Sequence, residues 1–217
     1  MSLDGRKAHL ALTMGACFGA GSLYGWSGYL SAVRAAFGVS NASASMVFSL
    51  ALVSFTLGVL LGPVLLARLS RHLRLPVMAG VAALSLAVAG SSTGFGLFTA
   101  IYGGCFGFTS GVLYNLAVSS AAASGKPTLM VPVSVAAFGL GGAVFGPASV
   151  WLADAGWGLW AIAPALVCLA SVAIAALVVR PSSGMEKTQQ NMALQPIRPD
   201  RTLAVLWVIF AAGSCSG

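Results

Sequence analysis

The sequence predicts an all-α membrane protein in which six transmembrane helices form two inverted three-helix repeats, followed by the start of a seventh helix. Two observations support this fold class. Of the 217 residues, 58% are hydrophobic and only 7% are charged, whereas roughly a quarter of the residues in a soluble domain are charged. In addition, two motifs of the first half of the chain recur in the same order in the second half.

Apolar runs long enough to cross a bilayer follow one another along the chain. The predicted spans cover residues 9–33, 44–67, 76–94, 96–123, 128–153 and 156–179. They make residues 1–180 a predicted N-terminal six-helix bundle. Residues 181–202 contain three prolines, which discourage a continuous helix, and form a predicted cytoplasmic linker. Residues 203–217 are apolar but reach only about 22 Å as a helix, short of a core of roughly 30 Å, so they predict a truncated seventh helix.

The basic residues predict the orientation of the chain in the membrane. If the N-terminus is cytoplasmic, all lysines and arginines except Arg34 fall in inner segments. This positive-inside bias predicts a multi-pass protein of the cell (plasma or inner) membrane. The net charge of +7 is therefore explained by topology. Nucleic acid is excluded as a partner, because nucleic-acid binding needs basic residues clustered on a soluble face.

The residue types argue against an enzyme or a cofactor protein. The four cysteines lie in apolar runs and are interpreted as unpaired small hydrophobic residues. The sequence shows no metal-ligand spacing, no nucleophile–base pair and no cofactor motif. It therefore predicts no enzyme activity, no metal site and no cofactor.

The recurring motifs predict the repeat. The first and fourth spans share Cys17-Phe18-Gly19 with Leu23-Tyr24 and Cys105-Phe106-Gly107 with Leu113-Tyr114. The second and fifth spans share Gly58-x-x-x-Gly62-Pro63 and Gly142-x-x-x-Gly146-Pro147. Gly-x-x-x-Gly alone is a common packing motif of membrane helices, but this does not explain why proline follows it in both copies. Because three helices are an odd number, the second copy must enter the membrane with opposite polarity.

The stretch 19–30, GAGSLYGWSGYL, is the strongest candidate for a functional site. It places Tyr24, Trp26 and Tyr29 among small residues in the middle of the first span. Aromatic hydroxyls and an indole N–H inside a membrane need partners on other helices or a wet cavity. The stretch therefore predicts part of a lined path through the membrane.

Four segments carry a resemblance to a known family: residues 23–29, 102–115, 137–141 and 206–217. The chain resembles the N-terminal half of a major facilitator superfamily transporter, and within it the oxalate/formate antiporter and monocarboxylate porter branch. The resemblance covers nearly the whole chain but only about half of such a transporter. It implies a secondary active transporter of small organic anions that works by alternating access. The implied partners are the lipid bilayer, the anion and a missing C-terminal half of the same carrier.

The resemblance also implies site residues. Tyr24, Tyr29 and Tyr114 would cage a small carboxylate, with Trp26 beside them. Phe138 stands where the oxalate porter has a tyrosine, so one hydroxyl is absent, which argues against oxalate itself.

Structural interpretations of these residues stay open. Tyr24 and Tyr114 could instead be hydrogen-bond partners between helices. Trp26 and Tyr29 could sit in an aromatic belt at the outer interface. Asn115, a further candidate on the path, is more typical of contacts between membrane helices than of a ligand site.

The loop between the second and third spans resembles the superfamily's cytoplasmic loop motif in part. That motif reads glycine, a spaced aspartate, a basic residue, then glycine and more basic residues. Here Ala67 and Ser70 replace the aspartate and the second glycine. The residues that match are Gly62, Arg68, Arg71 and Arg74.

The predicted spans lack charge at membrane depth. No Asp, Glu, Lys or Arg lies well inside any of the six predicted spans, whereas proton-coupled transporters need a titratable group there. Either the coupling resides in a missing second half, or the carrier exchanges or passively passes its substrate. The alternatives to a transporter are a truncated or degenerate membrane protein without transport activity, or a half-size carrier that must dimerise.

Overall fold

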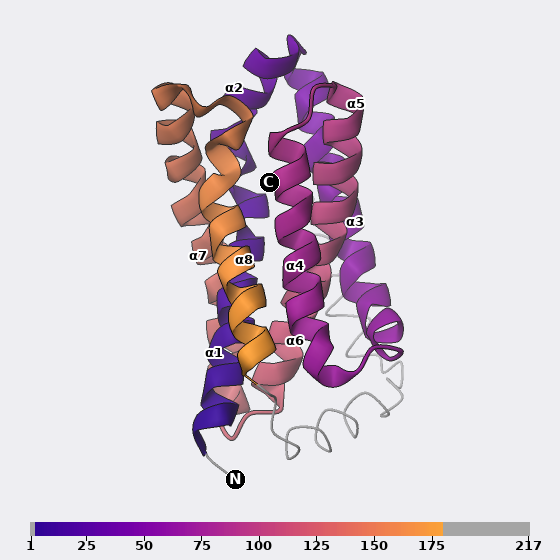
Figure 1. Ribbon diagram of the computed structural model, residues 1–217, viewed down its shortest axis with the longest axis vertical. Coiled ribbons are helices and arrows are strands. Elements are labelled where there is room, and N and C mark those ends of the chain that lie inside the picture. The colour runs from indigo at the N-terminus through magenta and orange to yellow at the C-terminus, as the bar shows by residue number, and fades with distance from the viewer. Residues whose placement is uncertain (1–2, 180–217) are drawn as a thin grey trace, which may run out of the picture.

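The computed structural model describes residues 3–179, which are helical almost throughout and contain no strand (Figure 1). This confirms the all-α prediction. The predicted linker 181–202 and seventh helix 203–217 lie outside the described residues. In chain order the elements are α1 (Leu3–Ala20), the 3-10 helix η1 (Gly21–Gly25), α2 (Trp26–Phe37), α3 (Asn41–Leu66), α4 (Arg71–Gly90), α5 (Phe95–Phe98), the π-helix η2 (Thr99–Phe106), α6 (Gly107–Ala122), α7 (Pro127–Leu152), the π-helix η3 (Ala153–Trp157), the 3-10 helix η4 (Gly158–Ile162) and α8 (Ala163–Val178).

Within residues 3–179 the chain forms five continuous helical segments, so the predicted count of six separate helices is wrong. The difference lies between α7 and α8, which η3 and η4 join without a loop. Gly156 and Gly158 have φ of 88° and 54°, a conformation that glycine adopts without steric cost. Both glycines leave the helical conformation, so the chain reverses there, and α7 and α8 run in opposite directions (Figure 1).

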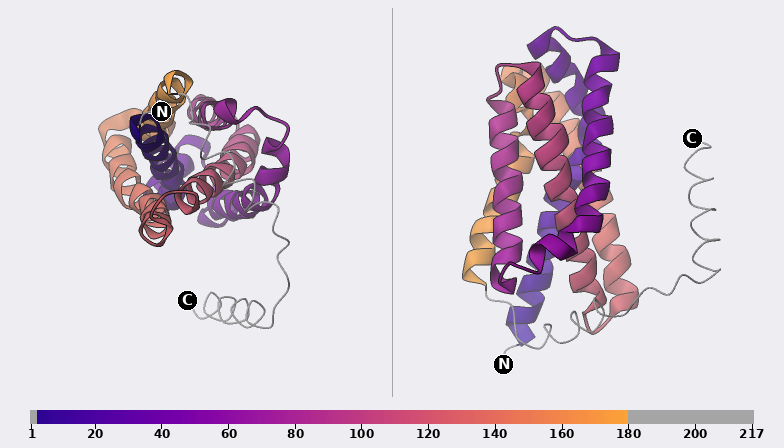
Figure 2. Two further views of the ribbon diagram at one scale, coloured as in Figure 1. Left: turned by 90° about the horizontal axis from the view of Figure 1, so that it is seen from below. Right: turned by 90° about the vertical axis from the view of Figure 1, so that its right-hand side faces the viewer.

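The helices lie side by side along the long axis of the molecule (Figures 1 and 2). The N-terminal end of α1 and the α3–α4 and α6–α7 connections lie at the lower end in Figure 1. The α2–α3, α4–α5 and α7–α8 connections lie at the upper end. Consecutive segments thus alternate in direction, which is the arrangement of an up-and-down helical bundle.

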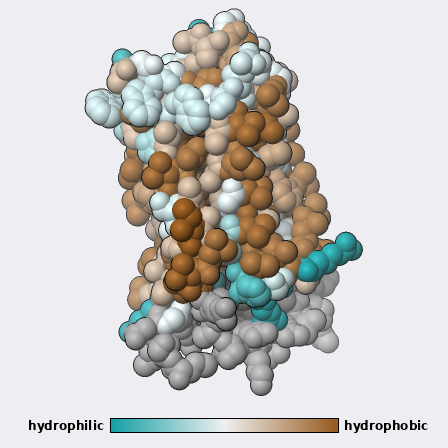
Figure 3. Space-filling view, in the orientation of Figure 1, coloured by the Kyte–Doolittle hydropathy of each residue, from teal (hydrophilic) through white to brown (hydrophobic). Residues whose placement is uncertain are grey.

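The surface of the bundle matches a membrane environment. Four helices are long and apolar enough to cross a membrane, namely Asn41–Leu66, Arg71–Gly90, Phe95–Ala122 and Pro127–Val178. Large apolar side chains such as Leu60, Val64 and Leu84 are exposed on them. Figure 3 shows a hydrophobic middle between a pale upper end and hydrophilic residues near the lower end. Apolar helices whose backbone groups bond internally are what a bilayer accepts.

The first helical segment packs against α7 with its backbone in direct contact. A Cβ added at Gly21 would collide with the carbonyl oxygen of Phe138, and one at Gly141 would collide with that of Phe18. A Cβ at Gly28 would collide with the carbonyl oxygen of Gly146. We call this contact the α1–α7 glycine seam. Such close approach is possible only because these positions lack side chains.

A second glycine seam joins α3 to α6. Cβ atoms at Gly58 and Gly111 would collide with the carbonyl oxygens of Phe108 and Phe55. Gly62 is in the same seam, since its Cβ would lie 3.1 Å from a methyl group of Val112. Gly62 therefore belongs to a helix–helix contact and lies away from the predicted loop.

The loop predicted between the second and third spans, with its basic residues at 68–74, is shorter than expected, because α4 already begins at Arg71. Arginine and leucine favour helix, so the segment RHLRL extends the apolar helix toward its N-terminus. Arg74 donates a hydrogen bond from Nε to the carbonyl oxygen of Leu69 at 3.1 Å, and Arg68 is exposed in the connection. Of the motif's basic residues, Arg68 lies in the loop, whereas Arg71 and Arg74 lie on the helix.

Candidate functional site

A cavity of about 410 Å³ opens on the face of the bundle formed by η1, α3, α6 and α7. We call it the tyrosine cavity. Its lining residues are Tyr24, Phe55, Thr56, Val59, Tyr114, Val135, Phe138 and Gly139. Three of the predicted site residues, far apart in sequence, thus meet in one place.

Phe138 lies at the centre of the aromatic side chains in this cavity. The rings of Tyr24 and Tyr114 meet the ring of Phe138 edge to face, with centroid distances of 5.2 and 5.4 Å. Phe55 packs on the same ring at 5.3 Å and on Tyr114 at 5.7 Å. Edge-to-face contacts of this kind hold aromatic rings in fixed orientations. The rings of Tyr24 and Tyr114 are therefore held in position by their shared contact with Phe138.

The polar groups of the cavity are hydroxyls. Within the described part of the chain, neither Tyr24 nor Tyr114 makes a hydrogen bond through its hydroxyl, and Tyr24 is 51% exposed. Thr56, in contrast, donates to the carbonyl oxygen of Leu52 in its own helix at 3.0 Å. None of the residues that line the cavity is charged. The site can thus donate two phenolic hydrogen bonds to a small solute, but it supplies no counter-charge.

Trp26 and Tyr29 lie outside the tyrosine cavity and also outside any exposed aromatic belt. They are 5% and 1% exposed and pack on Tyr102, with centroid distances of 5.2 and 5.9 Å. Tyr29 donates from its hydroxyl to the carbonyl oxygen of Leu159 at 2.6 Å. Positions two and five residues beyond Tyr24 turn to other faces of the helical segment. The structure therefore does not bring these two residues together with Tyr24 and Tyr114 around the tyrosine cavity.

Asn115 makes a contact between helices, as one of the two interpretations of the sequence expected. Its side-chain amide donates to the carbonyl oxygen of Val59 in α3 at 3.1 Å, and the Ser119 hydroxyl donates to its Oδ1 at 3.1 Å. Val59 lies four residues before Pro63, which has no N–H to complete the helical hydrogen bond. Asn115 therefore satisfies the carbonyl that Pro63 leaves without its usual donor.

This arrangement predicts coupling between Asn115 and Pro63. Asn115→Leu should lower the free energy of unfolding by about 1–3 kcal/mol, because the Val59 carbonyl is left without a donor. Pro63→Ala restores a backbone N–H for that carbonyl, so Asn115→Leu should cost clearly less in a Pro63→Ala background. Thermal unfolding of the four proteins in detergent measures both costs. Equal costs in the two backgrounds would contradict the assignment.

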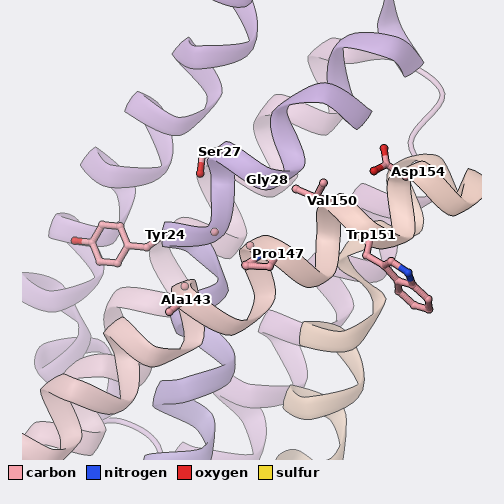
Figure 4. Close-up of a pocket in the computed structure, with 11 residues that line it drawn as sticks. Tyr24, Ser27, Gly28, Ala143, Pro147, Val150, Trp151 and Asp154 are labelled. Carbon is pink, nitrogen blue, oxygen red and sulfur yellow. The ribbon is translucent and has the colours of Figure 1, made fainter.

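A second depression, a groove of about 680 Å³, runs between η1–α2 and α7 (Figure 4). Gly28, Ala143 and Pro147 lie along it, with the Ser27 hydroxyl at one wall. Figure 4 shows the rings of Tyr24 and Trp151 pointing away from its middle at opposite ends. Tyr24 lines both the groove and the tyrosine cavity, so the two adjoin on one face of the bundle.

The groove contains one charged residue among those that line it. Asp154 is exposed at its upper end, in η3. A carboxylate there disfavours a bound anion nearby. An anion that uses this face is therefore better placed at the tyrosine cavity than in the groove.

No protein-family model matches this chain, and no curated protein matches it. The resemblance to the major facilitator superfamily therefore rests on the sequence motifs alone.

Proposed function

We propose that the chain forms the N-terminal half of a secondary active transporter of small organic anions, of the major facilitator type, that works by alternating access. The tyrosine cavity carries this proposal. It brings together the hydroxyls of Tyr24 and Tyr114, which have no hydrogen-bond partner within residues 3–179, beside the ring of Phe138 on an open face of an apolar bundle. Polar groups inside a membrane bundle are costly and mark functional sites by default, and carriers hold their solutes between repeats near the middle of the bundle.

The pairing of the helices supports the proposed repeat. In α3, Gly58 and Gly62 precede Pro63 and pack on α6. In α7, Gly142 and Gly146 precede Pro147 and pack on the first helical segment. In the proposed repeat the first span corresponds to the fourth, and the second to the fifth. The α3–α6 contact joins the second span to the fourth, and the contact of α7 with the first segment joins the fifth span to the first. The two contacts are therefore equivalent under the repeat. The remaining pair, α4 and α8, pack on each other. Because the chain turns at Gly156, the fifth helical segment crosses the membrane once as α7 and once as α8. Each proposed repeat therefore has three membrane crossings.

The distribution of charge supports a cytoplasmic N-terminus. Lys7 lies near the start of α1, Arg68 in the α3–α4 connection and Lys126 in the α6–α7 connection, and these three parts of the chain are at the lower end of the bundle in Figure 1. Arg34 is in the last turn of α2 and Asp154 is in η3, next to the α2–α3 and α7–α8 connections at the opposite end. Basic residues are retained on the cytoplasmic side of membrane proteins. We therefore assign the lower end of the bundle to the cytoplasmic side of the plasma or inner membrane.

Hydrogen bonds from the two tyrosines do not offset the cost of dehydrating a carboxylate. Two phenolic hydrogen bonds to a carboxylate contribute about 1.5–3 kcal/mol each. Removing a carboxylate from water costs at least several kcal/mol. No residue that lines the tyrosine cavity is charged, so a cation from outside the described residues has to complete the site. We assign that cation to the second half of the carrier. Because Phe138 offers no hydroxyl, monocarboxylates such as formate fit better than oxalate.

The test is solute exchange by the protein isolated from its native membrane. Proteoliposomes loaded with unlabelled formate are diluted into labelled formate or lactate, with labelled choline as the matched control of opposite charge. The proposal expects saturable uptake of the monocarboxylates that other monocarboxylates inhibit, and no uptake of choline. If no monocarboxylate is exchanged by protein that remains folded, the assignment of a non-transporting membrane protein replaces it.

A further inference from the structure

A small internal cavity lies where three irregular stretches of helix meet. The 3-10 helices η1 and η4 and the π-helix η2 each contribute to its wall, together with α2, α7 and α8. Its polar lining comes from the hydroxyls of Ser22, Tyr29, Tyr102 and Ser149. None of these residues lines the tyrosine cavity. We call this space the hydroxyl cavity.

Two of the four hydroxyls already use their protons. Tyr29 donates to the carbonyl oxygen of Leu159 at 2.6 Å, and Ser149 donates to that of Ala161 at 3.1 Å. Each hydroxyl oxygen keeps lone pairs that can accept a hydrogen bond. Toward the hydroxyl cavity, Tyr29 and Ser149 are therefore acceptors.

The other two hydroxyls have protons to donate. The Oγ of Ser22 is buried and has no hydrogen-bond partner in the part of the chain that the structure describes. Tyr102 is only 2% exposed, and among the described residues its hydroxyl has no partner either. A buried hydroxyl without a partner loses its hydration and gains nothing in return. Toward the same cavity, Ser22 and Tyr102 are thus free donors.

We infer that one water molecule occupies the hydroxyl cavity and completes this set. A water molecule accepts two hydrogen bonds and donates two, which matches two free donors and two acceptors. The cavity leaves about 10 Å³ for the centre of a water molecule, which is room for one. A metal cation is a poorer fit, because no charged residue lines the cavity and the carbonyls of Leu159 and Ala161 already accept hydrogen bonds.

The bound water joins parts of the bundle that the regular helical pattern does not hold together. Through Ser22 and Tyr102 it links η1 to η2, and through Ser149 it links both to α7. Irregular turns leave backbone groups without their usual helical partners, and polar side chains and waters then satisfy them. We expect the water to stabilise the site where the first segment is wound as a 3-10 helix.

The test combines direct observation with the sign of a change in melting temperature. A crystal or cryo-electron-microscopy structure of the complete protein that resolves ordered waters should show one within hydrogen-bonding distance of Ser22 Oγ and the Tyr102 hydroxyl. Ser22→Ala and Tyr102→Phe should each lower the Tm by about 2–4 °C in detergent. Because both bond to one water, the loss in the double variant should be smaller than the sum.

If no water occupies the hydroxyl cavity, the two substitutions should change the Tm in the opposite direction. Removing a buried hydroxyl that has no partner should then raise the Tm. Ser85→Ala gives the baseline, because Ser85 is also buried but donates within its own helix, to the carbonyl oxygen of Val81 at 2.8 Å. An empty cavity at that resolution, or single variants whose Tm equals or exceeds that of the unmodified protein, would overturn the inference.

Discussion

Replacing Gly141 with alanine is expected to abolish the accumulation of folded protein. The added Cβ would collide with the carbonyl oxygen of Phe18 across the α1–α7 glycine seam. A backbone atom cannot move aside as the end of a side chain can, so the helices have to separate and lose their contact. We expect a cost of at least about 3 kcal/mol, the upper range for overpacking. The yield of monodisperse protein after detergent extraction, followed by its Tm, measures this effect.

The matched control is Gly80→Ala on α4. A Cβ at Gly80 meets no atom within 4 Å, and alanine in a helix interior is favoured over glycine by about 0.5–1 kcal/mol. Gly80→Ala should therefore fold with an unchanged or slightly higher Tm. If Gly141→Ala is recovered with the Tm of the unmodified protein, the first segment and α7 do not pack as described.

Removing the hydroxyls of the tyrosine cavity is expected to weaken transport strongly while the protein still folds. A hydrogen bond to a charged group contributes about 1.5–3 kcal/mol, which corresponds to roughly a 10- to 150-fold change in affinity. Tyr24→Phe and Tyr114→Phe should each raise the half-saturation concentration for monocarboxylate exchange within that range. Their Tm should change little, because neither hydroxyl has a partner among the described residues.

The control for this experiment is Ser171→Ala. Ser171 is exposed on α8 and donates to the carbonyl oxygen of Val167 in its own helix at 2.8 Å, so the variant should exchange as the unmodified protein does. Exchange is compared per amount of folded protein. Should both tyrosine variants match Ser171→Ala in affinity and rate, the hydroxyls do not contact the solute and the tyrosine cavity loses its proposed role.

Much of the fold and part of the site could be predicted from the sequence. Apolar runs interrupted by short polar segments locate the helices, because hydrophobic length is the dominant constraint in a membrane. The repeated motifs singled out Tyr24 and Tyr114, and the resemblance added Phe138. The structure places these three side chains around one cavity. Whether they bind a solute stays a prediction.

Other features of the site could not be read from the sequence, for physical reasons. Phe55 and Thr56 line the cavity, but α3 is apolar on all sides, so no periodic pattern marks the face that packs inward. Trp26 and Tyr29 share a stretch with Tyr24, yet the helical turn directs them into the core beside Tyr102.

The irregular helices depend on packing that a single sequence does not reveal. The change from α to 3-10 or π winding at η1 and η2 shifts hydrogen bonds by one residue without a distinct sequence signal. Gly156 is the first residue of the predicted sixth span, and the structure places a reversal of the chain there. The surrounding residues nevertheless keep helical turns, which is why α7 and α8 form one continuous segment.

The most direct test of the central claim is the reactivity of cysteines placed in the tyrosine cavity. In a variant with all four native cysteines replaced, Tyr114→Cys is treated with a membrane-impermeant thiol reagent from each side. A carrier cavity predicts reaction, which saturating monocarboxylate slows. Ile174→Cys, exposed on α8 but outside the cavity, should react only with a lipid-soluble reagent. If Tyr114→Cys also reacts only with the lipid-soluble reagent, this face contacts lipid and the carrier assignment is contradicted.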